Sequence, residues 1–295
     1  MPSTRDIRRR IKSVKNTAQI TKAMQMVASS KMRRAQQAAL AGRPYAVLMN
    51  EVLKAVSENA GDFSHPLMEK RPVRKRAVIL VSTDKGLCGA LNSNLLREAT
   101  RIEKENTVYI CAGRKGSQFI ARTRRQMVAE FTYKDSPAFS EARAISRFAQ
   151  EMFLKGEVDQ IDALFTNFIS TLNQKPDLRP FLPIGEVKTF DPALEGEGTG
   201  GSLAREEGAL EYLFEPGAQE VFSGLLPHYL SYRMYQILLE AKASEHSSRM
   251  VAMKNATDNA KQLIKDLTLE YNKLRQNNIT KELLEITTAQ MALGT

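Results

Sequence analysis

The chain has 295 residues, of which 42% are hydrophobic and 7% aromatic, with no tryptophan. It can form one large domain or two modest ones with a mainly aliphatic core, and no apolar run approaches the ~20 residues of a membrane-spanning helix. The net charge of +10 is local, because residues 1–43 hold eleven basic residues and one acid, whereas the remainder holds 32 of each. A nucleic acid, an anionic lipid or an acidic protein surface could each bind such a segment.

Residues 3–59 predict one long helix, which Gly42 and Pro44 are expected to kink without ending it. An Arg-rich start is also typical of a mitochondrial transit peptide, but the helical pattern runs past that length, and no apolar segment follows as in a secretory signal. Ten positions alternate steps of four and three, the a/d spacing of a left-handed coiled coil. They are Ile7, Ile11, Val14, Ala18, Thr21, Gln25, Ala28, Met32, Ala35 and Ala39.

A second apolar stripe lies off this seam and contains Ile20, Ala23, Met24 and Val27. With Met26 it makes the segment apolar nearly all round, which a two-stranded coil cannot bury. The stripe is either the wide core face of a bundle or a surface that something else surrounds.

The middle of the chain predicts an α/β domain. Apolar runs at residues 77–81, 107–111 and 160–166 predict buried parallel strands, and residues 179–184 predict the start of another. Helical sequence between them, at residues 94–105 and 138–155, gives the alternation of a mainly parallel, Rossmann-like sheet covered by helices. A glycine-rich loop spans residues 191–201.

From about residue 216 the chain again predicts one long helix, with no proline after Pro227. One stripe contains Ala256, Ala260, Leu263, Leu267 and Leu274, and another contains Ile279, Leu283, Ile286 and Gln290. Two long terminal helices suggest an antiparallel coiled coil. The expected divisions are an N-terminal coiled-coil helix at 1–70, a central α/β domain at 71–191, a loop and foot at 192–215, and a C-terminal coiled-coil helix at 216–295.

The sequence offers little sign of an active site. No phosphate-binding loop motif occurs, and the glycines after the first two predicted strands lack the spacing of a dinucleotide-binding loop. The three histidines are scattered, and His246 is expected to lie at the surface or in the helical seam. Cys88 and Cys111 lack metal-ligand spacing, so we expect reduced thiols. No catalytic residue, cofactor or metal is predicted.

Several segments resemble the gamma subunits of bacterial F-type ATP synthases. Residues 6–32, DIRRRIKSVKNTAQITKAMQMVASSKM, are similar to the family's N-terminal signature, and residues 243–259, ASEHSSRMVAMKNATDN, to its C-terminal signature. Residues 82–92, STDKGLCGALN, resemble its first strand and loop, and residues 269–276 and 279–282 extend the likeness. The likeness covers nearly the whole chain in order, although residues 287–291 are bulkier than the family's usual small tail.

The resemblance implies a non-catalytic central shaft. Such a shaft couples ion-driven rotation of a membrane c-ring to sequential conformational change and ATP synthesis at catalytic beta subunits. The implied partners are three alpha and three beta subunits, the epsilon subunit and the c-ring, with no nucleic acid. The implied place is the cytoplasmic face of the bacterial inner membrane, with membrane contact only through the complex.

The resemblance also implies which residues contact those partners. A collar of alpha and beta subunits would surround Ile20, Met24 and Val27, and loops of beta would meet Lys85, Cys88, Arg275, Gln276 and Thr280. The foot on the c-ring would contain Tyr212, Leu213, Phe214 and Glu215.

Two other interpretations stay open at this point. A basic coiled-coil nucleic-acid binder explains the N-terminal charge but not the α/β region, and it predicts steeply salt-dependent binding to duplex DNA. A small nucleotide-dependent enzyme built on the α/β region predicts saturable binding of ATP or NAD by the isolated chain.

Overall fold

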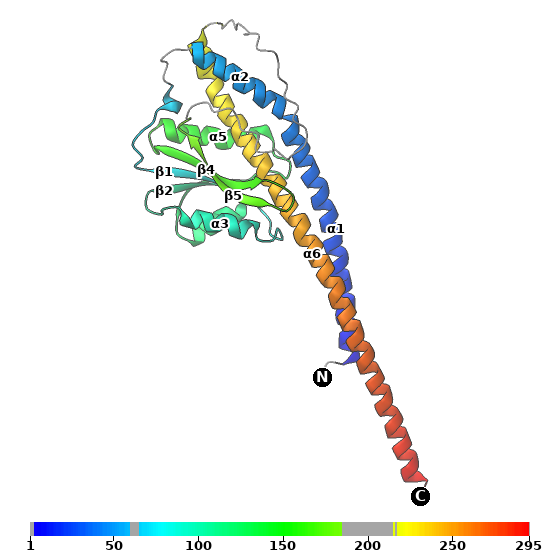
Figure 1. Cartoon of the computed structure of the whole chain (residues 1–295). Coiled ribbons are helices and arrows are strands. Elements are labelled where there is room, and N and C mark those ends of the chain that lie inside the picture. The colour runs from blue at the N-terminus through cyan, green and yellow to red at the C-terminus, as the bar shows by residue number, and fades with distance from the viewer. Residues whose placement is uncertain (1–2, 60–64, 185–214, 216, 295) are drawn as a thin grey trace. The chain divides into compact units, whose positions relative to one another are not determined.

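The computed structural model describes residues 3–59, 65–184, 215 and 217–294 (Figure 1). Its described residues pack into two units. The smaller unit combines the chain up to Ala28 with the chain from Met250 onward, and the larger one runs from Ser29 to Arg249. The two terminal helices each contribute to both units. None of the described helices has the length and apolar character needed to cross a membrane.

The described part of the chain forms six α-helices, one short 3-10 helix and five strands. The helices are α1 (Thr4–Ala41), α2 (Arg43–Asn59), the 3-10 helix η1 (Pro66–Met68), α3 (Leu91–Arg101), α4 (Arg114–Arg122), α5 (Phe139–Leu154) and α6 (Ala218–Leu293). The strands are β1 (Arg76–Val81), β2 (Thr107–Ala112), β3 (Gln126–Phe131), β4 (Gln160–Phe168) and β5 (Gln174–Leu182).

The strands form one sheet in the order β3-β2-β1-β4-β5. The first four are mutually parallel, and β5 runs antiparallel to β4. The predicted mixed fold, a central Rossmann-like α/β region with long terminal helices, is therefore confirmed.

The sheet of the larger unit is covered on both faces. Alternate residues of β1 point to opposite sides, so Ile79 packs in the core that contains α5 and part of α6, whereas Leu80 packs against α3 and α4. Figure 1 shows β1 inside the sheet with α5 and α3 on opposite faces, and all residues of β1 after Arg76 are buried. This double cover leaves the loops at the strand ends and the exposed edge strand β3 as the parts of the sheet that can meet other groups.

The structure corrects several predicted boundaries. Two elements, β3 and α4, were not predicted, because β3 is a largely exposed edge strand with only three consecutive apolar residues, Met127 to Ala129, and α4 is short. The strand expected at 179–184 begins earlier, at Gln174, and Pro176 and Pro180 lie inside it, which an edge strand tolerates. The helix expected at 94–105 lies at Leu91–Arg101, and the backbone is already extended at Ile102, before β2 begins at Thr107.

The predicted kink at Gly42 is instead a helix end: α1 stops at Ala41 and α2 starts at Arg43. The Tyr232 hydroxyl donates to the Gly42 carbonyl at 2.6 Å. A Cβ atom at position 42 would lie only 2.6 Å from that hydroxyl oxygen. Close approach of α6 therefore explains the glycine, and Pro44, which has no backbone N–H, begins a new helix readily.

The predicted antiparallel coiled coil is present in the smaller unit. All ten predicted α1 seam residues are buried or half-buried, and the seven from Ile7 to Ala28 belong to this unit. The Thr21 and Thr257 hydroxyls lie 2.7 Å apart, and the Arg8 guanidinium contacts the Tyr271 hydroxyl. Since the partner numbers fall along α6 as the α1 numbers rise, the helices run in opposite directions.

The α6 seam differs from the predicted stripe. A series with alternating steps of four and three is buried or half-buried and contains Met253, Thr257, Ala260, Ile264, Leu267, Tyr271 and Leu274. Ala256 of the predicted stripe is half-buried as well. Leu263, a member of the predicted stripe, is 38% exposed. Selecting only aliphatic residues overlooked Thr257 and Tyr271, whose hydroxyls find partners across the coil.

Candidate functional site

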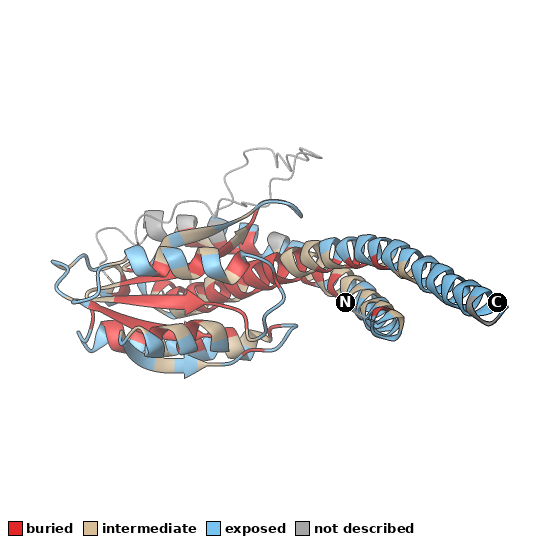
Figure 2. Cartoon of the chain, turned by 90° about the horizontal axis from the view of Figure 1, so that it is seen from below, coloured by how far each residue is buried: buried red, intermediate tan, exposed pale blue. Residues whose placement is uncertain are grey.

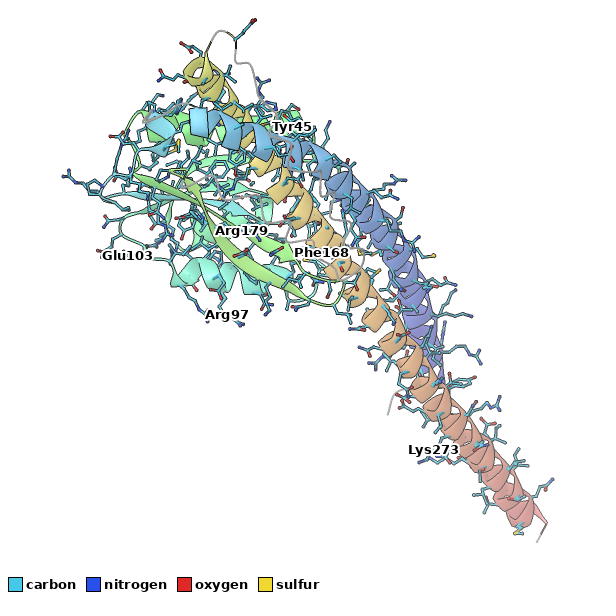
Figure 3. All side chains as sticks on the ribbon, turned by 45° about the horizontal axis from the view of Figure 1, so that its top comes forward. Tyr45, Arg97, Glu103, Phe168, Arg179 and Lys273 are labelled. Atoms are coloured by element: carbon cyan, nitrogen blue, oxygen red, sulfur yellow. The ribbon has the colours of Figure 1, made fainter. Side chains whose placement is uncertain are left out.

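The distal part of α6 carries apolar side chains that no described residue covers. Ile279, Leu283, Ile286 and Met291 are all about half exposed or more, and Leu284 lies beside them with 62% exposure. Figure 2 shows this end of α6 as exposed, and in Figure 3 the side chains beyond Lys273 stand out from the helix. Scattered exposed apolar residues are ordinary, but a contiguous set along one helix is typical of an interaction surface.

The predicted contact residues of this helix lie on the same stretch. Arg275, Gln276 and Thr280 are exposed, and the Thr280 hydroxyl donates to the Gln276 carbonyl of its own helix at 3.0 Å. Their side chains are therefore available to a partner.

The second apolar stripe of α1 is also largely uncovered. Ile20 and Val27 are 61% and 54% exposed, Ala23 is exposed, and Met24 is half-buried. The described residues do not make this stripe the core face of a bundle, because Ile20 and Val27 stay largely exposed and only Met24 is half-buried. The stripe can contact another molecule.

A third candidate surface is the turn between β1 and α3. Lys85 and Leu87 are exposed there, whereas Cys88 is buried. The Ser248 hydroxyl donates to the Cys88 carbonyl at 2.7 Å, and burial raises the pKa of the Cys88 thiol. The backbone of the turn and its two exposed side chains, rather than the thiol, are what a partner would meet.

The helix start next to this turn is occupied by the chain itself. The α4 backbone N–H groups of Arg114, Lys115 and Gly116 donate to the Asp84 carboxylate, the Thr83 carbonyl and the Ser82 hydroxyl at 3.0, 3.0 and 2.7 Å. In nucleotide-binding folds such groups bind phosphate. A phosphate here would have to displace these contacts and approach a carboxylate, so the geometry disfavours a nucleotide site.

The close fit at this helix start depends on Gly113. Its φ of +105° is a conformation that other residues rarely adopt. A Cβ atom there would lie 2.2 Å from the Ser82 carbonyl oxygen. The glycine therefore allows the ends of β1 and β2 to pack closely, and it leaves no space for a ligand at this position.

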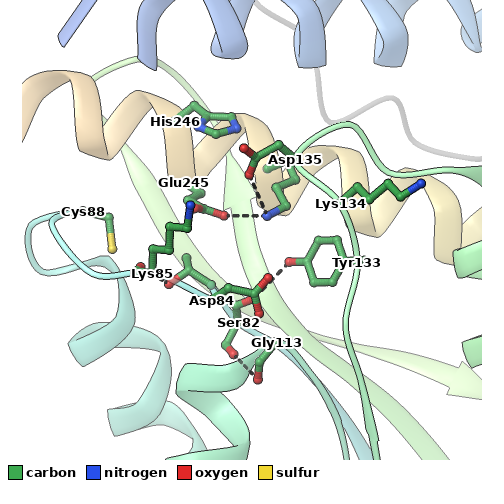
Figure 4. A network of polar contacts seen from close by, with 12 residues as sticks. Ser82, Asp84, Lys85, Cys88, Gly113, Tyr133, Lys134, Asp135, Glu245 and His246 are labelled. Carbon is green, nitrogen blue, oxygen red and sulfur yellow. Dashed lines mark hydrogen bonds and ion pairs between the residues drawn. The ribbon is translucent and has the colours of Figure 1, made fainter. Parts of the chain in front are cut away.

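Behind the turn lies a network of charged side chains, of which Lys242 and Glu245 are buried and Asp135 is exposed (Figure 4). The Lys242 ammonium lies 3.0 Å from Glu245 Oε2 and 3.7 Å from Asp135 Oδ1, and 4.5 Å from the centre of the Tyr133 ring. Asp135 also pairs with Lys31 of α1 at 2.5 Å. The network therefore links α1, the loop after β3 and α6 within the larger unit.

Two groups of the network have strongly shifted pKa values. The hydrogen bond from Lys31, supported by the nearby charge of Lys242, lowers the pKa of Asp135 to about 2 despite partial burial. Burial lowers the pKa of His246 to about 4, against the raising effect of Glu245. At neutral pH Asp135 is thus ionised and His246 is neutral, with its Nε2 unpartnered among the described residues.

Sequence reasoning missed the centre of this network. Lys242, Glu245 and Arg249 are spaced three and four apart, which places them on one face of a helix, and this spacing could have been noticed. The partner Asp135 is more than a hundred residues from both Lys31 and Lys242, so no local pattern indicates it. Among the described residues, no group of three or more His, Cys, Asp or Glu side chains could hold a metal ion.

Comparison with known proteins decides the family. A family model described as ATP synthase matches residues 3–293. The ATP synthase gamma chain of Opitutus terrae is 50% identical over 99% of each chain, and that of Methylacidiphilum infernorum is 48% identical over the whole of both. The chain belongs to the ATP synthase gamma chain family.

Solved structures agree with this gamma-chain fold. A chain from the Euglena gracilis mitochondrial ATP synthase, in a structure of its OSCP, F1 and c-ring parts, matches with a TM-score of 0.66 at 20% identity. The match covers 98% of this chain and 94% of that one. A chain from the rotor of the same synthase matches with a TM-score of 0.64 at 18% identity, over 94% and 98%. The residues expected in the gamma-chain foot, Tyr212, Leu213 and Phe214, lie outside the described residues, and Glu215 is exposed.

Proposed function

We propose that the chain is the central rotor shaft of an F-type ATP synthase. It couples ion-driven rotation of the c-ring to sequential conformational change and ATP synthesis at the catalytic beta subunits, and it performs no bond chemistry itself. The observation that carries this proposal is the row of uncovered apolar side chains on distal α6, including Leu283 and Ile286, in a member of the gamma chain family. A surrounding collar of subunits would bury that row.

The proposed partners are three alpha and three beta subunits, the epsilon subunit and the c-ring. The proposed place is the cytoplasmic face of the bacterial inner membrane, with the chain held there through the complex. The domain limits at residues 70, 191 and 215 also remain part of this proposal.

The proposed mechanism is a shift of conformational populations. A ligand changes an equilibrium only through contacts that differ between the two states. The two helices of the smaller unit present different side chains in different directions, for example the exposed Ile20 and the seam residue Thr21. As the shaft turns, three identical beta subunits meet three different faces, and their nucleotide affinities change in sequence.

Specific contacts are proposed for each surface. The collar contacts Ile20, Met24 and Val27, and loops of beta contact the β1–α3 turn at Lys85 and the backbone near Cys88. Further contacts with beta involve Arg275, Gln276 and Thr280. The foot on the c-ring comprises Tyr212, Leu213, Phe214 and Glu215.

The test is co-expression of the chain with alpha and beta subunits of the same source, followed by purification and measurement of ATP hydrolysis. A complex of the three subunits is expected to hydrolyse ATP, and the chain alone is expected to be inactive. Deletion of residues 276–295 removes the tip contacts and is expected to lower the rate by about tenfold, equivalent to ~1.4 kcal/mol of coupling. Leu172→Ser, at an exposed turn between β4 and β5, is the control and should leave the rate unchanged.

Other outcomes would favour the rival interpretations. If the chain fails to join the complex but binds ATP or NAD in a calorimetric titration, the enzyme interpretation replaces the shaft. If the chain instead binds duplex DNA with steep salt dependence, the nucleic-acid interpretation replaces the shaft interpretation.

A further inference from the structure

Three charged side chains on α6 form a connected row that leads from the core of the larger unit to the β1–α3 turn. Lys242, Glu245 and Arg249 lie on one face of the helix because they are three and four residues apart. Lys242 binds Glu245 Oε2 at 3.0 Å, and Arg249 binds the other oxygen, Oε1, at 2.8 Å. Glu245 therefore uses one carboxylate oxygen for each neighbour.

The inner end of the row is a buried ammonium group. Lys242 is only 1% exposed, and a buried charge is costly unless it is paired. Its neighbours are Glu245, the Asp135 carboxylate at 3.7 Å and the face of the Tyr133 ring. A methionine could fill this space without the cost of burying a charge, so packing alone does not explain a lysine here.

The outer end of the row holds the backbone of the turn. Arg249 donates to the carbonyl oxygens of Gly86 and Lys85 at 3.2 and 3.4 Å. The next residue, Leu87, has a φ of 62°, the left-handed region that side chains other than glycine rarely occupy. Such a conformation persists only where the surroundings hold it. The Arg249 contacts lie directly beside it.

We propose that Lys242 is a positioning residue for the β1–α3 turn. Lys242 fixes the position of the Glu245 carboxylate, and this carboxylate fixes the guanidinium of Arg249. Arg249 in turn holds the turn in the conformation that presents Lys85 and Leu87 outward. That these two side chains meet a partner rests on the proposed function. The positioning itself is a property of the isolated chain and is tested there.

The two cysteines provide a reporter and an internal control. Cys88 is buried inside the turn, and Cys111 is buried in β2, where burial raises the pKa of its thiol to about 12. The experiment measures alkylation of each thiol by iodoacetamide in the full-length chain, resolved by mass spectrometry. Opening of the turn would expose Cys88 alone, whereas general unfolding would expose both.

Lys242→Met is expected to raise the alkylation rate of Cys88 by about tenfold, the effect of losing one charge-assisted hydrogen bond. The Cys111 rate should not change. The electrostatic effect has the opposite sign, because the charge of Arg249 lowers the pKa of Cys88 and a loss of nearby positive charge would slow alkylation. A faster reaction therefore reports opening of the turn. Lys261→Met, which removes an exposed ion pair with Asp258 on the same helix, is the matched control and should have no effect.

A double-variant comparison tests whether Lys242 acts through Arg249. The chain with both Lys242→Met and Arg249→Met should react at Cys88 no faster than the chain with Arg249→Met alone. Additive rate increases, or an unchanged Cys88 rate in Lys242→Met, would overturn the proposal. If Lys242→Met loosens both cysteines equally, Lys242→Gln decides, because it removes the charge but keeps a polar side chain, whereas a change at Glu245 would itself lower the pKa of Cys88 and speed alkylation. That variant must expose Cys88 selectively, and failure to do so also overturns the proposal.

Discussion

At the scale of single residues, Glu240 of α6 is a buried carboxyl group whose protonation depends on the fold. Its Oε2 has no hydrogen-bond partner among the described residues. Burial raises its pKa from the ordinary 4.5 to about 7; the nearby Arg179 of β5 opposes the rise and Asp177 adds to it. Figure 3 labels Arg179 on that strand. Glu240 therefore prefers to be protonated in the folded chain.

This preference predicts a pH-dependent stability. Because the folded chain holds the Glu240 proton more tightly than the unfolded chain, the free energy of unfolding should fall as pH rises from about 4.5 to about 7 and then level off. The expected fall from this group is on the order of 3 kcal/mol. Glu240→Gln removes the ionisation, so the variant should match the natural chain near pH 4.5 and exceed it in stability at pH 8.

Urea unfolding monitored by circular dichroism between pH 4.5 and 8 checks this prediction. Glu270→Gln, at an exposed position of the same helix, is the control and should follow the natural chain at every pH. The prediction would be contradicted if the free energy of unfolding changed with pH in the same way for Glu240→Gln and for the natural chain.

At the scale of elements, the coiled coil of the smaller unit depends on small and hydroxyl-bearing seam residues. Thr21 and Thr257 meet through their hydroxyls, and Ala28 and Ala260 are buried in the seams of their helices. Small side chains let two helices approach closely, but they bury little apolar area each. The few larger seam residues, Ile7 and Leu267 among them, should therefore carry much of the stability of the coil.

Leu267→Ala is expected to destabilise the coil by about 2–3 kcal/mol, since it deletes a buried leucine side chain. Leu269→Ala, two residues away and 71% exposed, should change stability by less than about 0.5 kcal/mol. Hydrogen exchange of the α1 amides up to Ala28 measures the effect. Equal exchange rates in the two variants would show that Leu267 does not hold α1.

At the scale of the whole molecule, one portion of α6 packs against the rest of the chain and the distal portion does not. Up to about Leu274 its seam packs on other parts of the chain, whereas from Arg275 to Met291 its residues are exposed. An isolated helical segment of such length is only marginally stable in water, because most helix stability in proteins comes from packing. The distal portion therefore depends on partners for its rigidity.

In the isolated chain, backbone amides of residues 276–293 should exchange rapidly with solvent, and assembly with alpha and beta subunits should slow their exchange by about tenfold or more. Residues 253–271, which form the seam, should be protected in both states and serve as the reference. Slow exchange of the distal amides before assembly would contradict the dependence on partners.

Local patterns in the sequence determined much of this structure. The heptad spacing from Ile7 to Ala39 identified the α1 seam, and continuous apolar runs identified β1, β2 and β4, because burial of a repeating face is encoded at fixed spacing along the chain. The family signatures at residues 6–32 and 243–259 identified the gamma chain family from the sequence alone. Domain limits and partner contacts remain predictions.

Only the tertiary structure decided the rest. The strand β3 and the prolines of β5 fit a sheet because both strands lie at its edges, which no local pattern reveals. The pairing of Lys242 with Asp135, the burial of Cys88 and the raised pKa of Glu240 depend on groups that are distant in the sequence and are brought together by packing. Electrostatic and steric contacts act over a few ångströms in space, whereas sequence patterns record only neighbours along one helix or strand.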